Sequence, residues 1–427
     1  MFTSNYKYNF IDVFSGAGGL SEGFFNCGYN PIAHVEMNGF ASDTLRTRSC
    51  YYYFKKTGNL NYYYNYLRGS ISKEQLYEKV PKEVLMTVIN EEISDKTYKS
   101  IFYKIDDIMK KDNIKEVDVL IGGPPCQAYS LVGRASTQGG MENDPRNDLY
   151  IQYARFLNKY KPKLFVFENV PGMLTAKDGV IWKRIKQRLR TVGYNIEHRL
   201  VNAHDFGVLQ HRKRVIIIGW RKDLDLHYPE FARMHVNAIV NDLLNDLCHL
   251  APGEEHNEYI TEPNEYLIES GIRDELDILT DHQTRNIRDV DRDIYRIAIE
   301  MWNDNHRRLH YTDLPENLQF HNNRVSFLDR FKVVEGDMES AHTMLAHISK
   351  DGHYYIHPDI EQARSLSVRE AARIQSFPDN YYFEGPRTAK FVQIGNAVPP
   401  LMAKGIATAI KNLLDGLETS YEKSIIN

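Results

Sequence analysis

The first half of the chain alternates short apolar runs with stretches of helical periodicity. The apolar runs are rich in β-branched and aromatic residues, and they lie at 10–14, 31–36, 115–121, 164–170 and 215–219. Continuous apolar runs of this length are typical of strands that are buried on both faces of a parallel sheet. Because helical stretches such as 146–159 and 179–192 lie between them, the pattern predicts βαβ units. It therefore indicates an α/β fold with a mixed, mostly parallel sheet.

Residues 45–100 interrupt this alternation. They include two runs of three tyrosines, at 51–53 and 62–64, followed by a charged, helix-like stretch. The segment is interpreted as an insertion into the α/β region. Its rings either pack against the helices of the insertion or stack on nucleic-acid bases, and packing is favoured.

The pattern changes again after residue 221. Residues 222–362 are polar and arginine-rich and lack regular strand spacing, which suits a second, smaller and irregular domain. A pattern typical of an α/β domain returns near Leu366, where Ser367 and Glu370 have the spacing of a capping box at a helix start. We therefore expect one domain from 1–221 and 363–427, with the second domain between its two parts.

Composition agrees with a globular chain of two domains. Of the 427 residues, 42% are hydrophobic and 26% are charged, and no stretch approaches the roughly 18 to 20 apolar residues of a membrane span. The first residues lack the layout of a secretory signal, so a cytoplasmic protein without membrane contact is expected. The four cysteines form no Cys-x-x-Cys pair and have no histidine at zinc-ligand spacing, so neither a metal site nor a disulfide framework is expected.

The net charge of −4 argues against a general nucleic-acid coat protein but leaves room for a locally basic surface. Two short segments, 183–190 and 210–214, are strongly cationic. A basic helix is more often a solvated face than a binding surface.

The strand at 117–121 ends abruptly in Gly122-Gly123-Pro124-Pro125, and Cys126 follows. Ligands in open α/β sheets gather at the carboxyl ends of strands, and the two prolines restrict the loop that leads to the thiol. Cys126 is therefore a candidate nucleophile. A buried, inert cysteine is the alternative.

A second group of residues suggests an adenosine-bearing cofactor. Glycines at 16, 18 and 19 form a turn after the first strand, and Glu36 ends the next strand, where its carboxylate can accept hydrogen bonds from ribose hydroxyls. Asp107 is a candidate acceptor for an adenine amino group. Ser21 stands where a dinucleotide fingerprint has its third glycine, which disfavours NAD and FAD.

Six motifs in this order resemble the DNA cytosine-5 methyltransferase family, of the prokaryotic restriction-modification or solitary type. They lie at 12–20, 123–127, 167–170, 210–214, 369–378 and 393–398. The resemblance covers about 8–220 and 364–412 and fades in the insertion and the middle region. It implies a Rossmann-like class I methyltransferase domain, with 222–362 as the target-recognition domain.

The resemblance also implies a mechanism. The Cys126 thiolate adds to C6 of a flipped cytosine, C5 accepts the methyl group, and β-elimination then releases the enzyme. By resemblance, Glu168 binds N3 and the exocyclic amine, and Arg212 binds O2. Arg214 either binds a phosphate or holds the nucleophile loop.

The implied cofactor is S-adenosyl-L-methionine, which leaves as S-adenosyl-L-homocysteine, with no metal. Met37 stands where many relatives place an aromatic residue beside the adenine. The expected contacts are Phe14, Gly16, Gly18, Glu36, Met37, Asp107, Ile108, Pro125, Leu149, Asn396 and Val398.

The implied partner is double-stranded DNA, bound by a monomer that associates with the nucleoid, and a cognate restriction endonuclease is a further candidate partner. Two alternatives stay open. A tRNA cytosine-5 methyltransferase is disfavoured because Cys248 precedes His249-Leu250 where that branch carries Cys-Phe-Thr. A catalytically silent DNA-binding paralogue is disfavoured because Cys126, Glu168 and Arg212 are all present.

Overall fold

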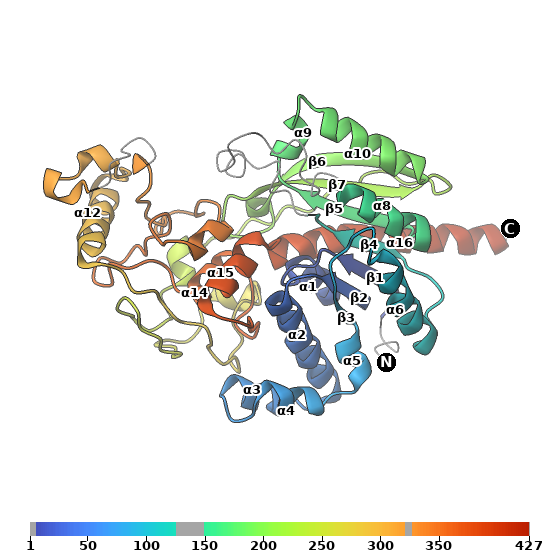
Figure 1. Ribbon diagram of the computed structural model, residues 1–427, viewed down its shortest axis with the longest axis horizontal. Helices are drawn as coiled ribbons and strands as arrows, with labels where there is room; N and C mark the ends of the chain where they lie inside the picture. Colours follow the sequence, from blue (N-terminus) through green and yellow to red (C-terminus); the bar gives the residue numbers. More distant parts are fainter. Residues whose placement is uncertain (1–5, 125–148, 321–326, 427) are drawn as a thin grey trace.

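The computed structural model describes residues 6–124, 149–320 and 327–426. Within these residues a single sheet of seven strands has the order β3-β2-β1-β4-β5-β7-β6 (Figure 1). Strand β7 runs antiparallel to both of its neighbours, β5 and β6, and the other neighbouring strands are parallel to each other. The strands are β1 Tyr8–Val13, β2 Tyr29–Glu36, β3 Val88–Asn90, β4 Val119–Gly122, β5 Leu164–Asn169, β6 Tyr194–Asn202 and β7 Lys213–Arg221. The prediction of a mixed, mostly parallel sheet is confirmed.

Helices cover both faces of this sheet. On one face the apolar side chains of α6, α8 and α10 pack against β1, β4 and β5. On the other face α1 and the long C-terminal helix α16 pack against the same strands (Figure 1). The helices are α1 Gly19–Asn26, α2 Gly39–Thr57, α6 Tyr98–Lys111, α8 Leu149–Tyr160, α9 Gly172–Thr175, α10 Val180–Thr191 and α16 Pro400–Ile426. No helix in the described part of the chain is long and apolar enough to cross a bilayer.

The insertion is narrower than expected. Helix α2 and strand β3 continue the α/β alternation, so that only three short helices between them are extra, namely α3 Asn61–Leu67, α4 Lys73–Glu78 and α5 Lys82–Met86. Strand β3 has three residues and gave no periodic signal of its own. The rings of Tyr51, Tyr52 and Tyr63 are buried in one cluster with apolar residues of α4 and α5, so these three tyrosines pack rather than face solvent.

Among the described residues, only the outer part of the middle region has a hydrophobic core of its own. Its outer part has its own small core around helix α12, Asp289–Asn305, which lies far from the sheet (Figure 1). Its inner part, including α11 Glu265–Glu269, shares one core with α14 Val368–Ile374 and α15 Arg387–Asn396. The capping box predicted at Ser367 and Glu370 is present at the start of α14.

Candidate active site

The carboxyl edge of the sheet brings together three segments that are distant in the sequence. Val13 pairs with Gly122, and Gly122 pairs with Phe167. The next residue on each of these strands therefore lies in the same row, because parallel strands end at one edge of a sheet. Phe14, Gly123 and Glu168 occupy this row.

Glu168 forms an ion pair with Arg214 across β5 and β7. The Arg214 Nε lies 2.7 Å from the Glu168 Oε1, and the two side chains are only 10% and 15% exposed. A Cβ atom at Gly123 would lie 2.7 Å from the Glu168 Oε2. Glycine at this position therefore leaves the carboxylate room beside the loop that leads to Cys126.

Arg212 has a different environment. Its side chain is buried, and its guanidinium donates to the carbonyl oxygens of Met344 at 2.6 Å and Gly395 at 3.1 Å. The sequence indicated that Arg212 faces the base with Glu168, but the structure places Arg214 beside that carboxylate. Arg212 instead joins β7 to the segments around 344 and 395.

Cys126 and Pro125 lie outside the described residues. The chain is described up to Pro124, whose carbonyl oxygen accepts a hydrogen bond from the Asn169 side-chain amide at 3.3 Å. Asn169 is buried at the end of β5. This bond fixes the loop two residues before Cys126 to the strand that carries Glu168.

The glycine turn after β1 is built around Glu36. The backbone N–H groups of Gly16 and Asn38 each donate to one carboxylate oxygen of Glu36 at 2.8 Å. Burial raises the pKa of Glu36. Gly16 has φ +53°, and a Cβ atom there would meet nothing within 4 Å, so open space lies against its backbone. Each carboxylate oxygen keeps a second lone pair, so the Glu36 carboxylate can still accept from a ligand hydroxyl.

Phe14, which also has positive φ, lies half-buried on the other side of Ser15. Gly18 packs tightly, since a Cβ atom there would lie 2.7 Å from Leu45 and 2.9 Å from the Tyr381 hydroxyl. Met37 is 63% exposed next to Glu36, and its side chain carries a thioether rather than an aromatic ring. Phe14, Gly16, Glu36 and Met37 therefore lie together around the glycine turn, and this group is called the cradle.

Asp107 and Ile108 do not belong to this cradle, which corrects the expectation. Both lie within α6, which starts after the carboxyl end of β3 and ends before the start of β4, so they lie toward the opposite edge of the sheet. Asp107 forms an ion pair with Lys111 at 2.7 Å, and Ile108 is part of the core.

The residue that the sequence missed beside Glu36 is Asn90, at the end of β3. Its side-chain amide donates to the carbonyl oxygens of Glu36 and Met37, both at 3.0 Å. A longer apolar run before Asn90 would have revealed the strand; three residues could not.

The far end of the chain contributes to the cradle. Asn396 ends α15 with an exposed side chain, and the carbonyl oxygen of Val398 lies so close to Gly19 that a Cβ there would be 2.2 Å away. Helix α16 packs against α1 through Gly23. The C-terminal helix therefore lies against the first part of the chain. Leu149 starts α8 and is half-buried.

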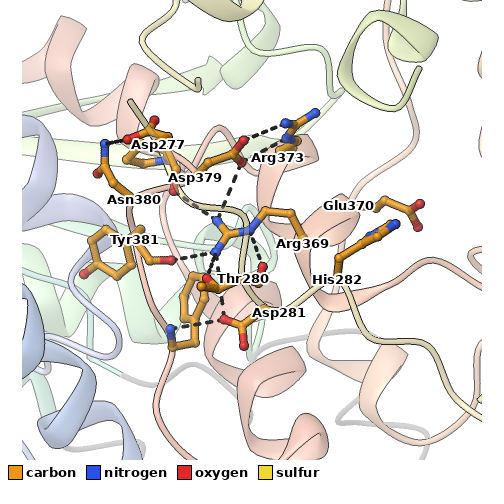
Figure 2. Close-up of polar contacts among 12 residues, drawn as sticks. Asp277, Thr280, Asp281, His282, Arg369, Glu370, Arg373, Asp379, Asn380 and Tyr381 are labelled. Atoms are coloured by element: carbon orange, nitrogen blue, oxygen red, sulfur yellow. Dashed lines mark hydrogen bonds and ion pairs between the residues drawn. The ribbon is translucent and has the colours of Figure 1, made fainter. Parts of the chain in front are cut away.

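A buried arginine network fastens the middle region to α14. Arg369 donates to the carbonyl oxygens of Thr280, Pro378 and Tyr381 (Figure 2). Arg373 pairs with Asp379 at 2.6 Å and with Asp246 of the middle region. Both arginines are fully buried. These contacts join the inner part of the middle region to α14.

The buried position of His357 leads us to expect that the free energy of unfolding decreases in mild acid. This side chain is buried 3.5 Å from Glu370, and burial, with help from Arg364, lowers its pKa from 6.5 to about 3. In the unfolded chain His357 takes up a proton near pH 6.5, whereas the folded chain keeps it neutral, so its contribution to stability is complete above pH 6.5 and decreases below it. Buried His282 has a lowered pKa for the same reason.

We expect the urea midpoint to fall from about pH 7 to about pH 5, and His357→Gln to make this decrease shallower. The matched control is His227→Gln, at an exposed position, which leaves the pH dependence as it is in the wild type. Equal slopes for His357→Gln and the wild type would contradict the assignment.

Comparison with known proteins gives one consistent result. The family described as C-5 cytosine-specific DNA methylase matches residues 78–412. The chain is 43% identical to the type II methyltransferase M.Bpa9945I of Bacillus paralicheniformis, over 95% of this chain and 99% of that protein. It is 29% identical to the type II methyltransferase M1.HphI of Haemophilus parahaemolyticus, over 94% and 86%.

Two solved structures share the fold. One is a prophage-encoded protein of E. coli assigned as a DNA modification methyltransferase, with a TM-score of 0.62 and 22% identity, covering 96% of this chain and 100% of that one. The other is the Dnmt2 methyltransferase of S. pombe, with a TM-score of 0.51 and 14% identity, covering 96% and 99%.

Proposed function

Because the chain belongs to the C-5 cytosine-specific DNA methylase family, and is therefore a DNA cytosine methyltransferase, we propose that it methylates C5 of one cytosine within a specific duplex sequence. The observation that carries this proposal is the Glu168–Arg214 ion pair at the carboxyl edge of the sheet, directly beside Gly123. A carboxyl group and a guanidinium fixed next to the loop of a candidate thiol match the polar edge of a cytosine ring.

Each residue has a distinct chemical task. The Cys126 thiolate forms a bond to C6, which moves electron density onto N3 and O2. Glu168 hydrogen-bonds at N3 and the exocyclic amine, and Arg214 donates to O2, so both stabilise the developing negative charge. We assign the O2 contact to Arg214 because Arg212 is committed to two backbone carbonyls. Loss of the C5 proton and departure of the thiolate then restore the ring.

S-adenosylmethionine fits the cradle at the glycine turn, and when bound it supplies the electrophilic methyl group. Glu36 would accept from the ribose hydroxyls, and Phe14, Gly16 and Asn396 would enclose the remainder. Open space at Gly16, together with the two backbone N–H donors that orient the Glu36 carboxylate, supports this placement. Asn90 joins this group in place of Asp107.

DNA must enter with the target base outside the helical stack, because a cytosine inside a duplex cannot reach groups at the edge of a sheet. The middle region, held on α14 by the arginine network, would read the surrounding sequence in the major groove. The bacterial relatives are type II methyltransferases, so we propose a role in restriction and modification, with a cognate endonuclease acting on the unmethylated site.

The assignment of Arg214 and Arg212 can be tested with two alanine variants. Arg214→Ala is expected to lower kcat about 10²- to 10³-fold, because one donor to the developing oxyanion is lost. Arg212→Ala is expected instead to lower the free energy of unfolding by about 2–4 kcal/mol, because two buried carbonyls lose their donor. Single-turnover methyl transfer and urea unfolding distinguish the two effects. A normal kcat for folded Arg214→Ala would contradict its proposed role.

The function itself is tested by incubating the full-length protein with radiolabelled S-adenosylmethionine and mixed genomic DNA, followed by digestion to nucleosides. The label is expected in 5-methyldeoxycytidine, and bisulfite sequencing of the same DNA gives the recognised site. Label in tRNA but not in DNA would favour a tRNA enzyme. No incorporation into either would favour a silent DNA-binding protein, and both results overturn the proposal.

A further inference from the structure

Helix α10 carries an unusually one-sided charge. Its twelve residues include five cationic side chains and no acid, namely Lys183, Arg184, Lys186, Arg188 and Arg190. Its apolar residues Ile181, Ile185 and Leu189 are buried against the sheet, so the cationic residues occupy the remaining faces. The whole chain has a net charge of −4, so this concentration runs against the overall composition.

The charge of α10 is not neutralised locally. Within the described part of the chain, none of its five cationic side chains forms an ion pair, whereas Lys111 pairs with Asp107 within α6 and Lys159 of α8 pairs with Asp106. An open groove along α10 is lined by Lys183, Lys186, Gln187, Arg190, Thr191 and Lys222. Lys222 joins this groove by donating to the carbonyl oxygen of Arg190.

The cationic row leads away from the catalytic edge. Helix α10 starts just after α9, which follows the strand of Glu168, and it runs toward the opposite edge of the sheet over β6 and β7 (Figure 1). At the catalytic edge, Lys213 is exposed and precedes Arg214. Side chains alternate along a strand, and Val215 and Ile217 pack with Ile185, so Lys213 lies on the α10 side of the sheet. The row therefore begins one residue from the proposed catalytic pair.

We propose that Lys213 and the cationic face of α10 form a sequence-independent contact surface for the phosphate backbone of duplex DNA flanking the target site. The proposal rests on the proposed function, because it needs the target base at the carboxyl edge. A helix of twelve residues spans about 18 Å, which is the axial rise of about five base pairs. Lys183, Lys186 and Arg190 follow one face at helical spacing and present a row of charges to a continuous row of phosphates.

Such contacts fix the position of the duplex without reading bases, and they release counterions, so they are recognised by their salt dependence. The test compares full-length wild type with the triple variant Lys183→Gln, Lys186→Gln and Arg190→Gln. Binding is measured against salt concentration on two duplexes that contain the site found by bisulfite sequencing. One has flanks of about 2 base pairs, shorter than the roughly five base pairs that α10 spans, and the other has flanks of about 20 base pairs.

On the long duplex, the triple variant is expected to have a log–log salt slope lower by about 2–3 and an affinity at least about tenfold weaker. On the short duplex both proteins are expected to bind alike within about twofold. The matched control replaces three exposed lysines on or beside α6, Lys99, Lys110 and Lys115, by glutamine, which changes the net charge equally. It is expected to leave the long-duplex slope within about one unit of wild type.

An unchanged long-duplex slope in the α10 variant would overturn the proposal and point to an acidic protein as the occupant of this face. An equal loss of slope in the α6 control would also overturn it, since the effect would then come from net charge alone. Methyl transfer to the short duplex is measured in parallel. If wild type methylates the short duplex and the α10 triple variant keeps the wild-type salt slope on the long duplex, only the proposal for the contact surface is wrong. If wild type does not methylate the short duplex, the proposed function is wrong.

Discussion

Replacing Cys126 by serine is expected to abolish the covalent adduct with 5-fluorocytosine DNA and to lower methyl transfer by about 10⁴-fold or more. A serine hydroxyl is not ionised near neutral pH, whereas a thiol readily supplies a thiolate. Without addition at C6, C5 is too poor a nucleophile to take a methyl group. Fluorine at C5 prevents the elimination that normally releases the enzyme, so wild type should be trapped on such DNA, which denaturing electrophoresis detects.

Cys248→Ser is the matched control for this experiment. Cys248 is half-buried in the middle region and its thiol donates to the carbonyl oxygen of His256. This variant should form the adduct as the wild type does. Cys126→Ser should still bind DNA, because Glu168, Arg214 and the middle region are unchanged. An adduct that persists in Cys126→Ser would show that another residue is the nucleophile.

The fold could be predicted where apolar runs are long. Strands such as β5 and β7 are buried on both faces, and their continuous apolar runs predict such strands. Strand β6 was missed because it lies at the edge of the sheet and mixes buried and exposed residues within a polar sequence. Strand β3 was missed because it has three residues. Without that strand, Asp107 was the candidate acceptor for an adenine amino group, but it lies within α6.

The candidate site, like the fold, was predicted only in part from the sequence. The order of the motifs indicated which residues meet at the carboxyl edge, and Glu36 and Glu168 lie there as expected. The roles of Arg212 and Arg214 could not be separated, because residues two apart along an extended chain point to the same side. The difference arises from Met344 and Gly395, more than a hundred residues away, whose carbonyls bind Arg212. Hydrogen bonds to residues so far away along the chain leave no pattern in the sequence around Arg212.

The arginine network connects the proposed catalytic and DNA-reading parts. Tyr381 accepts from Arg369 through its carbonyl oxygen, and its hydroxyl donates to the carbonyl oxygen of Ala17 in the glycine turn. One residue thus joins the inner part of the middle region to the cofactor cradle. The buried arginine network is therefore connected to the glycine turn through Tyr381.

Arg373→Met is expected to lower the free energy of unfolding by about 3–5 kcal/mol, because it removes one partner of a buried charge group. Arg373 is fully buried and bonds to both Asp379 and Asp246. Both carboxylates are buried and would lose a cation, although Arg273 still reaches Asp246 and so limits the loss. The measurement is urea unfolding followed by fluorescence and by methyl transfer.

Arg296→Met is the matched control, since Arg296 forms an exposed ion pair with Asp293 in α12 and its loss should cost about 0.5 kcal/mol or less. The double variant Arg373→Met with Asp379→Asn should recover part of the stability, because it also removes one unpaired charge. Recovery would show that the cost arises from the uncompensated carboxylate rather than from lost packing. If Arg373→Met unfolds at the wild-type urea concentration, the network does not fasten the middle region to the catalytic part.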